Sequence, residues 1–268
     1  ETFAGQVAVA LERVALEEGT QRARLETEAE RLRTSLLSSL SHDLRTPLGV
    51  ITGAASSLRA AGDGMTAEAR ADLLDSILDE SARMNRLIRN LLDMIRLETG
   101  SLQVQKEWQP LEDAVGVALI RMGDRLARHP VSVNLPLELP LIPIDAVLLE
   151  QVFINLLENA AKYTPEGTPI EISAEAALEA VTVTVADRGP GLPAGEEERI
   201  FEKFQRGADA EPGRGIGLGL TISRGIILAH GGRLWAENRE GGGAAFRFLL
   251  PLSGPAPAPI PQETEAGT

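Results

Sequence analysis

The sequence contains no cysteine, which excludes disulfide bonds, thiolate nucleophiles and cysteine-ligated zinc. Aromatic residues make up only 3% of its 268 residues, so aliphatic side chains must fill most of any core, which favours helices and plain α/β layers. Basic residues are outnumbered, because 26 Lys and Arg stand against 39 Asp and Glu, and the formal charge is −13. A surface with this charge repels phosphate backbones, so nucleic acid is not an expected partner.

The sequence also has no uninterrupted apolar run of about 18 residues, so we predict no membrane-spanning helix within it. No secretion signal precedes the first helical pattern. The chain starts at Glu1 in the middle of that pattern, which we interpret as a fragment of a longer protein. Residues 253–268 are mainly Pro, Ala, Glu and Thr, and because they have almost nothing to bury we expect a disordered tail.

A long helical pattern occupies the N-terminal part of the chain. Apolar residues recur at helical spacing through 3–60, and the charge-rich stretch 22–33 is typical of a signalling coiled coil. Gly62 and Gly64 interrupt the pattern, and a second helix is predicted over 67–98. Its apolar seam consists of Leu74, Ile77, Ser81, Met84, Ile88, Leu91 and Ile95. Two such helices predict an all-α hairpin that buries its stripes by dimerising into a four-helix bundle.

A mixed α/β pattern follows Gly100. Helices are predicted over 111–129, 145–163 and 218–230. Strands are predicted over 102–106, 131–135, 170–174, 181–186, 233–237 and 245–250. Alternation of valine and threonine in the strand 181–186 indicates that one face of the sheet is buried and the other is not. The fold class is therefore a helical hairpin followed by an α/β sandwich domain.

The octapeptide SHDLRTPL, residues 41–48, is the first motif with chemistry. His42 lies two residues from each of two seam leucines, so it points into solvent, where a neutral imidazole is a nucleophile for a phosphoryl group. Asp43 is placed to orient the ring or accept its proton, and Thr46 lies one helical turn beyond His42. Pro47 predicts a kink. For this segment alone, the alternative is an exposed surface histidine beside an accidental proline.

The predicted helix 145–163 carries polar residues on one face. Asn155, Asn159 and Lys162 are spaced four and three apart, so they lie together. Amide oxygens suit Mg²⁺, and a lysine supplies a charge for phosphate. An ordinary solvated face is the alternative for this segment alone.

Two glycine motifs follow. Asp187 to Gly191 (DRGPG) comes directly after a predicted strand, where a carboxylate can accept from an exocyclic amine and glycines let backbone approach a base. Gly213 to Leu220 (GRGIGLGL) opens a predicted helix, whose N-terminal amides form an anion site. Between them, the phenylalanines of IFEKF, 200–204, would hold a lid over 205–214, from which Arg206 and Arg214 could reach phosphates. Each feature taken alone has an alternative. The first motif could be an ordinary Gly-Pro turn, the second a flexible linker, and the two arginines solvated charges of the lid.

In this order, the segments resemble the phosphoacceptor, N, G1, F and G2 boxes of histidine kinases, whose ATP-binding domain has the GHKL (Bergerat) fold shared with gyrase, Hsp90 and MutL. The resemblance implies ATP and Mg²⁺ as cofactors, with Asn159 on the metal and Asn155 assisting. It implies that Asp187 reads the adenine amine. It implies further nucleotide contacts from Lys162, Tyr163, Gly189, Gly191, Arg206, Gly215, Gly217, Leu218 and Gly219.

Within the histidine kinases, the chain resembles the KdpD family of potassium sensors in the segments LLDM at 91–94 and KEW at 106–108. Its first four residues, ETFA, resemble the end of the GAF domain that precedes the kinase core in that family. The resemblance implies four parts: a signalling helix over 1–33, a dimerisation and phosphotransfer domain over 34–100, a catalytic domain over 101–252 and a tail over 253–268. It implies autophosphorylation of His42, transfer to a KdpE-like response regulator, and a phosphatase role for Thr46. It also implies a homodimer and the cytoplasmic portion of an inner-membrane sensor kinase.

Two alternatives remain open from the residues. One is an ATPase clamp of the same fold that forms no phosphoenzyme, which the intact octapeptide at 41–48 argues against. The other is a dimeric scaffold without turnover, which the presence of both asparagines and both glycine motifs argues against.

Overall fold

The computed structural model describes residues 44–61, 64–203, 205 and 217–253. The predictions for His42, Asp43, Arg206, Gly215, the signalling helix and most of the tail therefore lie outside the described residues. The described chain forms two compact units that divide between Leu87 and Ile88. In the described ranges, no helix is long and apolar enough to cross a membrane.

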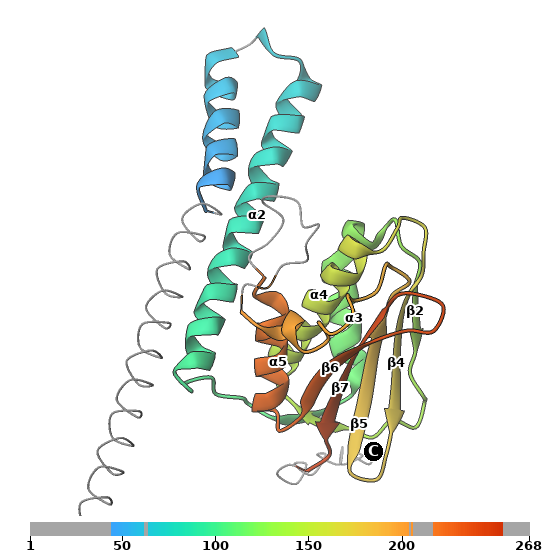
Figure 1. Cartoon of the computed structure of the whole chain (residues 1–268). Coiled ribbons are helices and arrows are strands. Elements are labelled where there is room, and N and C mark those ends of the chain that lie inside the picture. Colours follow the sequence, from blue (N-terminus) through green and yellow to red (C-terminus); the bar gives the residue numbers. More distant parts are fainter. Residues whose placement is uncertain (1–43, 62–63, 204, 206–216, 254–268) are drawn as a thin grey trace, which may run out of the picture. The chain divides into compact units, whose positions relative to one another are not determined.

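The described part of the first unit consists of one helix and of the next helix as far as Leu87, and the rest of that second helix belongs to the second unit. Residues 44–61 are helical, and α2 (Ala67–Glu98) has the bounds predicted from the sequence (Figure 1). Thr66 begins α2 because its Oγ1 accepts a hydrogen bond from the Ala69 amide at 3.2 Å, which satisfies one of the free amides of the first turn. In the single chain, Leu74 of the predicted seam is 47% exposed.

The second unit is a two-layer α/β domain. Its sheet has the strand order β2-β4-β5-β7-β6, with β2 parallel to β4 and the other pairs antiparallel. The strands are β2 (Val131–Asn134), β4 (Ile170–Ala176), β5 (Ala180–Ala186), β6 (Arg233–Asn238) and β7 (Ala244–Pro251). The main helices are α3 (Leu111–Met122), α4 (Ala146–Tyr163) and α5 (Gly219–Ala229).

The helices cover one face of this sheet (Figure 1). Val181, Val183 and Val185 of β5 face them and are almost fully buried, while the intervening threonines are partly exposed, as the alternation predicted. The Phe153 ring on α4 meets the Phe248 ring on β7 edge to face, with centroids 5.6 Å apart. We call the face that the helices leave uncovered the outer face of the sheet.

Two local predictions were wrong, and one strand was missed. No strand forms over 102–106; instead β1 (Glu107–Gln109) pairs with β3 (Ile142–Ile144), which was not predicted. The helix predicted over 111–129 ends as an α-helix at Met122, because Gly123 turns to a positive φ of 42° and a short 3-10 helix, Gly123–Leu126, follows.

Candidate functional site

Helix α4 begins at a side-chain cap. The Asp145 carboxylate accepts from the Leu148 amide at 3.2 Å through Oδ1 and from the Gln105 amide at 3.1 Å through Oδ2. Helix α4 packs on β4, β5 and α5, and it turns Asn155 toward α5 while Glu150 and Glu158 face α3 and the 3-10 helix after it. Helix α4 therefore carries both asparagines that the sequence pattern predicts as metal ligands, Asn155 and Asn159.

Asn155 is 9% exposed and joins α4 to the start of α5. Its Nδ2 donates to the Gly219 carbonyl at 3.1 Å and to the Ser223 hydroxyl at 3.2 Å. Because both of these bonds use the amide nitrogen, only Oδ1 could serve a metal ion. Asn155 thus brings the predicted N and G2 segments together, which the sequence pattern did not reveal.

The other polar residues of α4 lie along its last turns. Asn159 is partly exposed, and Lys162 Nζ donates to the Tyr163 hydroxyl at 2.9 Å and lies 4.5 Å from the centre of its ring. Tyr163 itself is 43% exposed. A lysine and an exposed aromatic ring at one helix end can meet a phosphate and a base respectively.

Asp187 follows β5 directly and is 5% exposed. Its Oδ1 accepts from the Gly189 amide at 2.7 Å and from the Ala244 amide at 3.2 Å. These two donors hold the carboxylate in one orientation. Gly189 also packs on Tyr163, since a Cβ there would lie 2.8 Å from the Tyr163 carbonyl oxygen. The predicted G1 loop therefore touches the end of α4.

The start of α5 closes the same region. Gly217 has a φ of 75°, which favours glycine, and Leu218 is buried beside it. A Cβ on Gly219 would come within 3.6 Å of Asn155, so the backbone of α5 lies close against α4. Helix α4 thus contacts both predicted glycine segments, the start of α5 through Asn155 and the loop after Asp187 through Tyr163.

The predicted F segment is attached to α5. Phe201 is buried, its carbonyl accepts from the Thr221 hydroxyl at 2.9 Å, and the Arg224 guanidinium lies 5.3 Å from its ring centre. This confirms that Phe201 holds the beginning of the segment in place. Phe204 and the proposed lid residues lie outside the described residues.

A buried histidine lies at the opposite end of the α4–α5 pair. His230 Nε2 accepts from the Asp145 amide at 3.0 Å, and its Nδ1 lies 2.8 Å from the Ile226 carbonyl. Lys106 Nζ donates to the His230 carbonyl at 2.8 Å. Burial lowers the pKa of His230 below its ordinary value, since a charged ring would lose its hydration. The neutral ring therefore joins α4 to α5, and the backbone carbonyl of His230 links both to the segment that follows α2 through Lys106.

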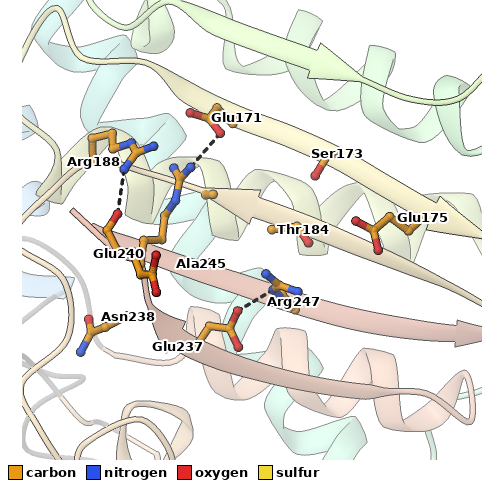
Figure 2. Close-up of a pocket in the computed structure, with 12 residues that line it drawn as sticks. Glu171, Ser173, Glu175, Thr184, Arg188, Glu237, Asn238, Glu240, Ala245 and Arg247 are labelled. Atoms are coloured by element: carbon orange, nitrogen blue, oxygen red, sulfur yellow. Dashed lines mark hydrogen bonds and ion pairs between the residues drawn. The ribbon is translucent and has the colours of Figure 1, made fainter. Parts of the chain in front are cut away.

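Sequence reasoning missed residues on the outer face of the sheet. A polar hollow of about 440 Å³ there is lined by Glu171, Arg188, Arg239 and Arg247, among others (Figure 2). Arg239 Nη1 donates to the Asp187 carbonyl at 3.1 Å, so the hollow adjoins the backbone of Asp187 rather than its carboxylate. The run of three glycines at 241–243, next to Arg239, was the available sequence signal.

The oxygen donors of the site suit Mg²⁺ only in company with phosphate. Across the described residues, no group of three or more His, Cys, Asp or Glu side chains could hold a metal ion. Asn159 and the Oδ1 atom of Asn155 are neutral oxygen donors, which fits an ion that keeps several waters and binds substrate phosphates.

Two stretches of the chain match known families. Residues 32–100 match the His Kinase A (phospho-acceptor) domain. Residues 144–254 match the family described as histidine kinase-, DNA gyrase B-, and HSP90-like ATPase. The first stretch contains the octapeptide at 41–48, and the second contains α4, Asp187 and α5.

Curated and solved proteins show the same likeness. Sensor protein KdpD of Escherichia coli (strain K12) is 44% identical over 254 residues, which is 94% of this chain and 28% of that protein. The full-length ShkA structure in complex with AMPPNP is 29% identical, with a TM-score of 0.61 over 84% of this chain and 47% of that chain. The histidine kinase ThkA in complex with the response regulator TrrA is 25% identical, with a TM-score of 0.60 over 83% and 64%.

Proposed function

The chain belongs to the sensor histidine kinases, where it is KdpD-like, and from this premise we propose that it phosphorylates its own His42 with ATP and passes the phosphoryl group to an aspartate of a response regulator. The observation that carries the proposal is that α4 contacts the start of α5 through Asn155 and the loop after Asp187 through Tyr163, in a domain that follows a phosphoacceptor match. An ATP site and a phosphoacceptor in one chain are what autophosphorylation requires.

Asp187 recognises adenine in this proposal. Backbone amides occupy its Oδ1, which leaves Oδ2 to accept a hydrogen bond from the exocyclic amine of the base. Because the carboxylate is nearly fully buried, an unmatched group opposite it would leave it without a partner, so a purine lacking the amine binds less well. Tyr163 lines the base pocket, and Lys162, Arg206 and the backbone amides at the start of α5 contact phosphates.

Asn159, assisted by Asn155, holds Mg²⁺ on the phosphates. When bound, the ion neutralises phosphate charge that would otherwise repel a nucleophile. The chain's own part is to supply neutral oxygen donors from α4, whose Asp145 cap and packing on the sheet keep these donors in place.

His42 is the nucleophile. A ring nitrogen attacks the γ-phosphorus in line, the bond from phosphorus to the bridging oxygen of ADP breaks, and the ring proton passes to Asp43 or water. The same phosphoryl group then transfers to the regulator's carboxylate. Thr46, an exposed residue of the hairpin, positions water for the reverse, phosphatase reaction on the regulator.

The hairpin supports a homodimer. Large apolar side chains along it are 43–66% exposed in the single chain, which is unusual for a stable surface. These residues are Leu48, Val50, Leu74, Leu78, Ile88, Leu92 and Ile95. A four-helix bundle formed with a second copy would cover them.

The relatives support a proposal for the partner and for the signal. ThkA was solved with its regulator TrrA, which supports a response regulator as the partner here, and the KdpD likeness supports a KdpE-like one. The same likeness supports potassium or osmotic-stress signalling by the cytoplasmic portion of an inner-membrane sensor. The chain spans 28% of the length of the KdpD relative.

The proposal is tested by labelling with γ-labelled ATP. Asn159→Ala should abolish labelling because the metal loses a ligand, while sedimentation still finds a dimer. Asn134→Ala, the same change on the exposed edge strand β2, is the matched control and should label normally. Normal labelling of Asn159→Ala, or its sedimentation as a monomer, would contradict the assigned role.

A further inference from the structure

Arg239 crosses the outer face of the sheet from the turn after β6. Its Nη1 donates to the Asp187 carbonyl at 3.1 Å, and its Nη2 lies 2.9 Å from Glu171 Oε2 on β4. Since β7 and β5 lie between β6 and β4 in the sheet, this side chain spans two strands. Figure 2 shows Glu171 on β4 and Arg188 beyond the end of β5, both at this end of the hollow. We call Arg239 and Glu171 together the outer clasp.

Small residues of the sheet lie along the outer clasp. Ala186 and Ala245 are paired across β5 and β7, and both line the hollow with Arg239. Although this face carries no helix, the two alanines are only 5% and 3% exposed, so the charged side chains of the hollow cover them. A larger residue at either position would occupy the path of the guanidinium.

The turn that carries Arg239 also contacts Asp187 directly. The Arg239 amide donates to the Gly243 carbonyl at 2.9 Å, and the Gly242 amide donates to the Arg239 carbonyl at 3.2 Å, so the turn is closed. A Cβ on Gly243 would lie 2.1 Å from the Asp187 carbonyl oxygen. The next residue, Ala244, donates its amide to Asp187 Oδ1. One turn therefore fixes both the carbonyl and the carboxylate of Asp187.

We propose that Arg239, oriented by Glu171, is a positioning residue for the Asp187 carboxylate and thereby sets the preference of the site for adenine over other purines. The inference rests on the proposed role of Asp187. The Asp187 carbonyl carbon is bonded to the Cα that carries the side chain, so a shift of the backbone here would move Oδ2 relative to the base. The outer clasp resists this shift with charge-assisted bonds made away from the nucleotide. The Arg239 guanidinium bonds to the Asp187 carbonyl and to Glu171, so we expect its effect to be confined to the base.

The test compares two nucleotides on the full 268-residue chain. Titration calorimetry measures Kd for a non-hydrolysable ATP analogue and for its inosine counterpart, in which a carbonyl replaces the amine. Arg239→Met should weaken the adenine nucleotide roughly tenfold, as expected for a lost charge-assisted bond, and change the inosine nucleotide less than about twofold. Glu171→Gln should shift the ratio of the two Kd values in the same direction by a smaller factor.

The matched control lies on the same face. Arg247 forms an ion pair with Glu237 at 2.8 Å (Figure 2) and does not bond to Asp187 in this arrangement. Arg247→Met should therefore leave the ratio unchanged. A general loss of folding would weaken both nucleotides equally, so the ratio separates positioning from stability.

Asp187→Asn separates the role of Asp187 from the role of the outer clasp. If this variant keeps the wild-type ratio, Asp187 does not read the amine and the proposed function fails at this residue. If Asp187→Asn lowers the ratio while Arg239→Met and Glu171→Gln keep it, the outer clasp is refuted and the role of Asp187 stands. If Arg239→Met does not fold, Glu171→Gln decides alone, and an unchanged ratio refutes the proposal.

Discussion

Replacing His230 by glutamine should remove a pH dependence from the stability of the α/β unit. The ring of His230 is 1% exposed and accepts the Asp145 amide through Nε2, which only the neutral form can do. Lys106 and Asp145 are the charged groups that face it, from the segment after α2 and from the start of α4. Glutamine keeps an acceptor and a donor but has no proton to titrate.

The sign follows from the lowered pKa. In the unfolded chain His230 binds a proton as pH falls through about 6.5, whereas in the folded protein its pKa is lower, so the unfolded state binds more protons in this window. Stability is therefore full above about pH 6.5 and is lost as pH falls toward the folded pKa. If the folded ring stays neutral, the loss between pH 7.5 and 5.5 is on the order of 1 kcal/mol.

Urea unfolding followed by tryptophan fluorescence measures this difference. Both tryptophans, Trp108 in β1 and Trp235 in β6, belong to the α/β unit, so the signal reports on that unit. The stability advantage of wild type over His230→Gln should shrink by on the order of 1 kcal/mol from pH 7.5 to 5.5, because all other titrating groups are common to both chains. An advantage that stays constant, or grows, would refute the neutral buried ring.

Three further results are expected. Gly243→Ala should destabilise the α/β unit by about 3 kcal/mol or more, since the φ of Gly243 is 96° and a Cβ there would meet the Asp187 carbonyl. The control Gly167→Ala, where φ is 83° and the space is open, should cost about 1 kcal/mol. Equal urea midpoints for the two variants would contradict this. Thr46→Ala should spare autophosphorylation and slow dephosphorylation of the regulator, measured in separate assays, and equal loss of both would count against its assigned role. Mixed dimers of His42→Gln and Asn159→Ala chains should label if transfer crosses between subunits, and their failure to label would indicate transfer within one chain.

Much of the fold could be predicted from local patterns. The bounds of α2 follow from the Thr66 cap and an uninterrupted helical pattern, and β5 follows from strict alternation of valine and threonine. By contrast, β3 has three residues with a central proline and exists because it pairs with β1, with Trp108 opposite Pro143. Pairing between residues so distant leaves no local pattern, so the sequence did not predict either strand.

The site shows the same division. The residues that we propose to meet a ligand could be predicted from motif spacing, because Asp187 and the glycines of 215–219 stand in short runs. Residues that act on other residues were not found. The bond from Asn155 to Gly219 and the span from Arg239 to Glu171 depend on how α5 and β6 are placed beside α4 and β4. That placement follows from the buried faces of the elements, not from any motif.

The central claim is that His42 accepts a phosphoryl group from ATP bound in the same protein. The most direct measurement is incubation with γ-labelled ATP, followed by acid and base treatment of the labelled chain. We predict a label that is lost in acid, kept in base and absent from His42→Gln. A label that persists in His42→Gln, or hydrolysis of ATP with no labelled protein, would contradict the account.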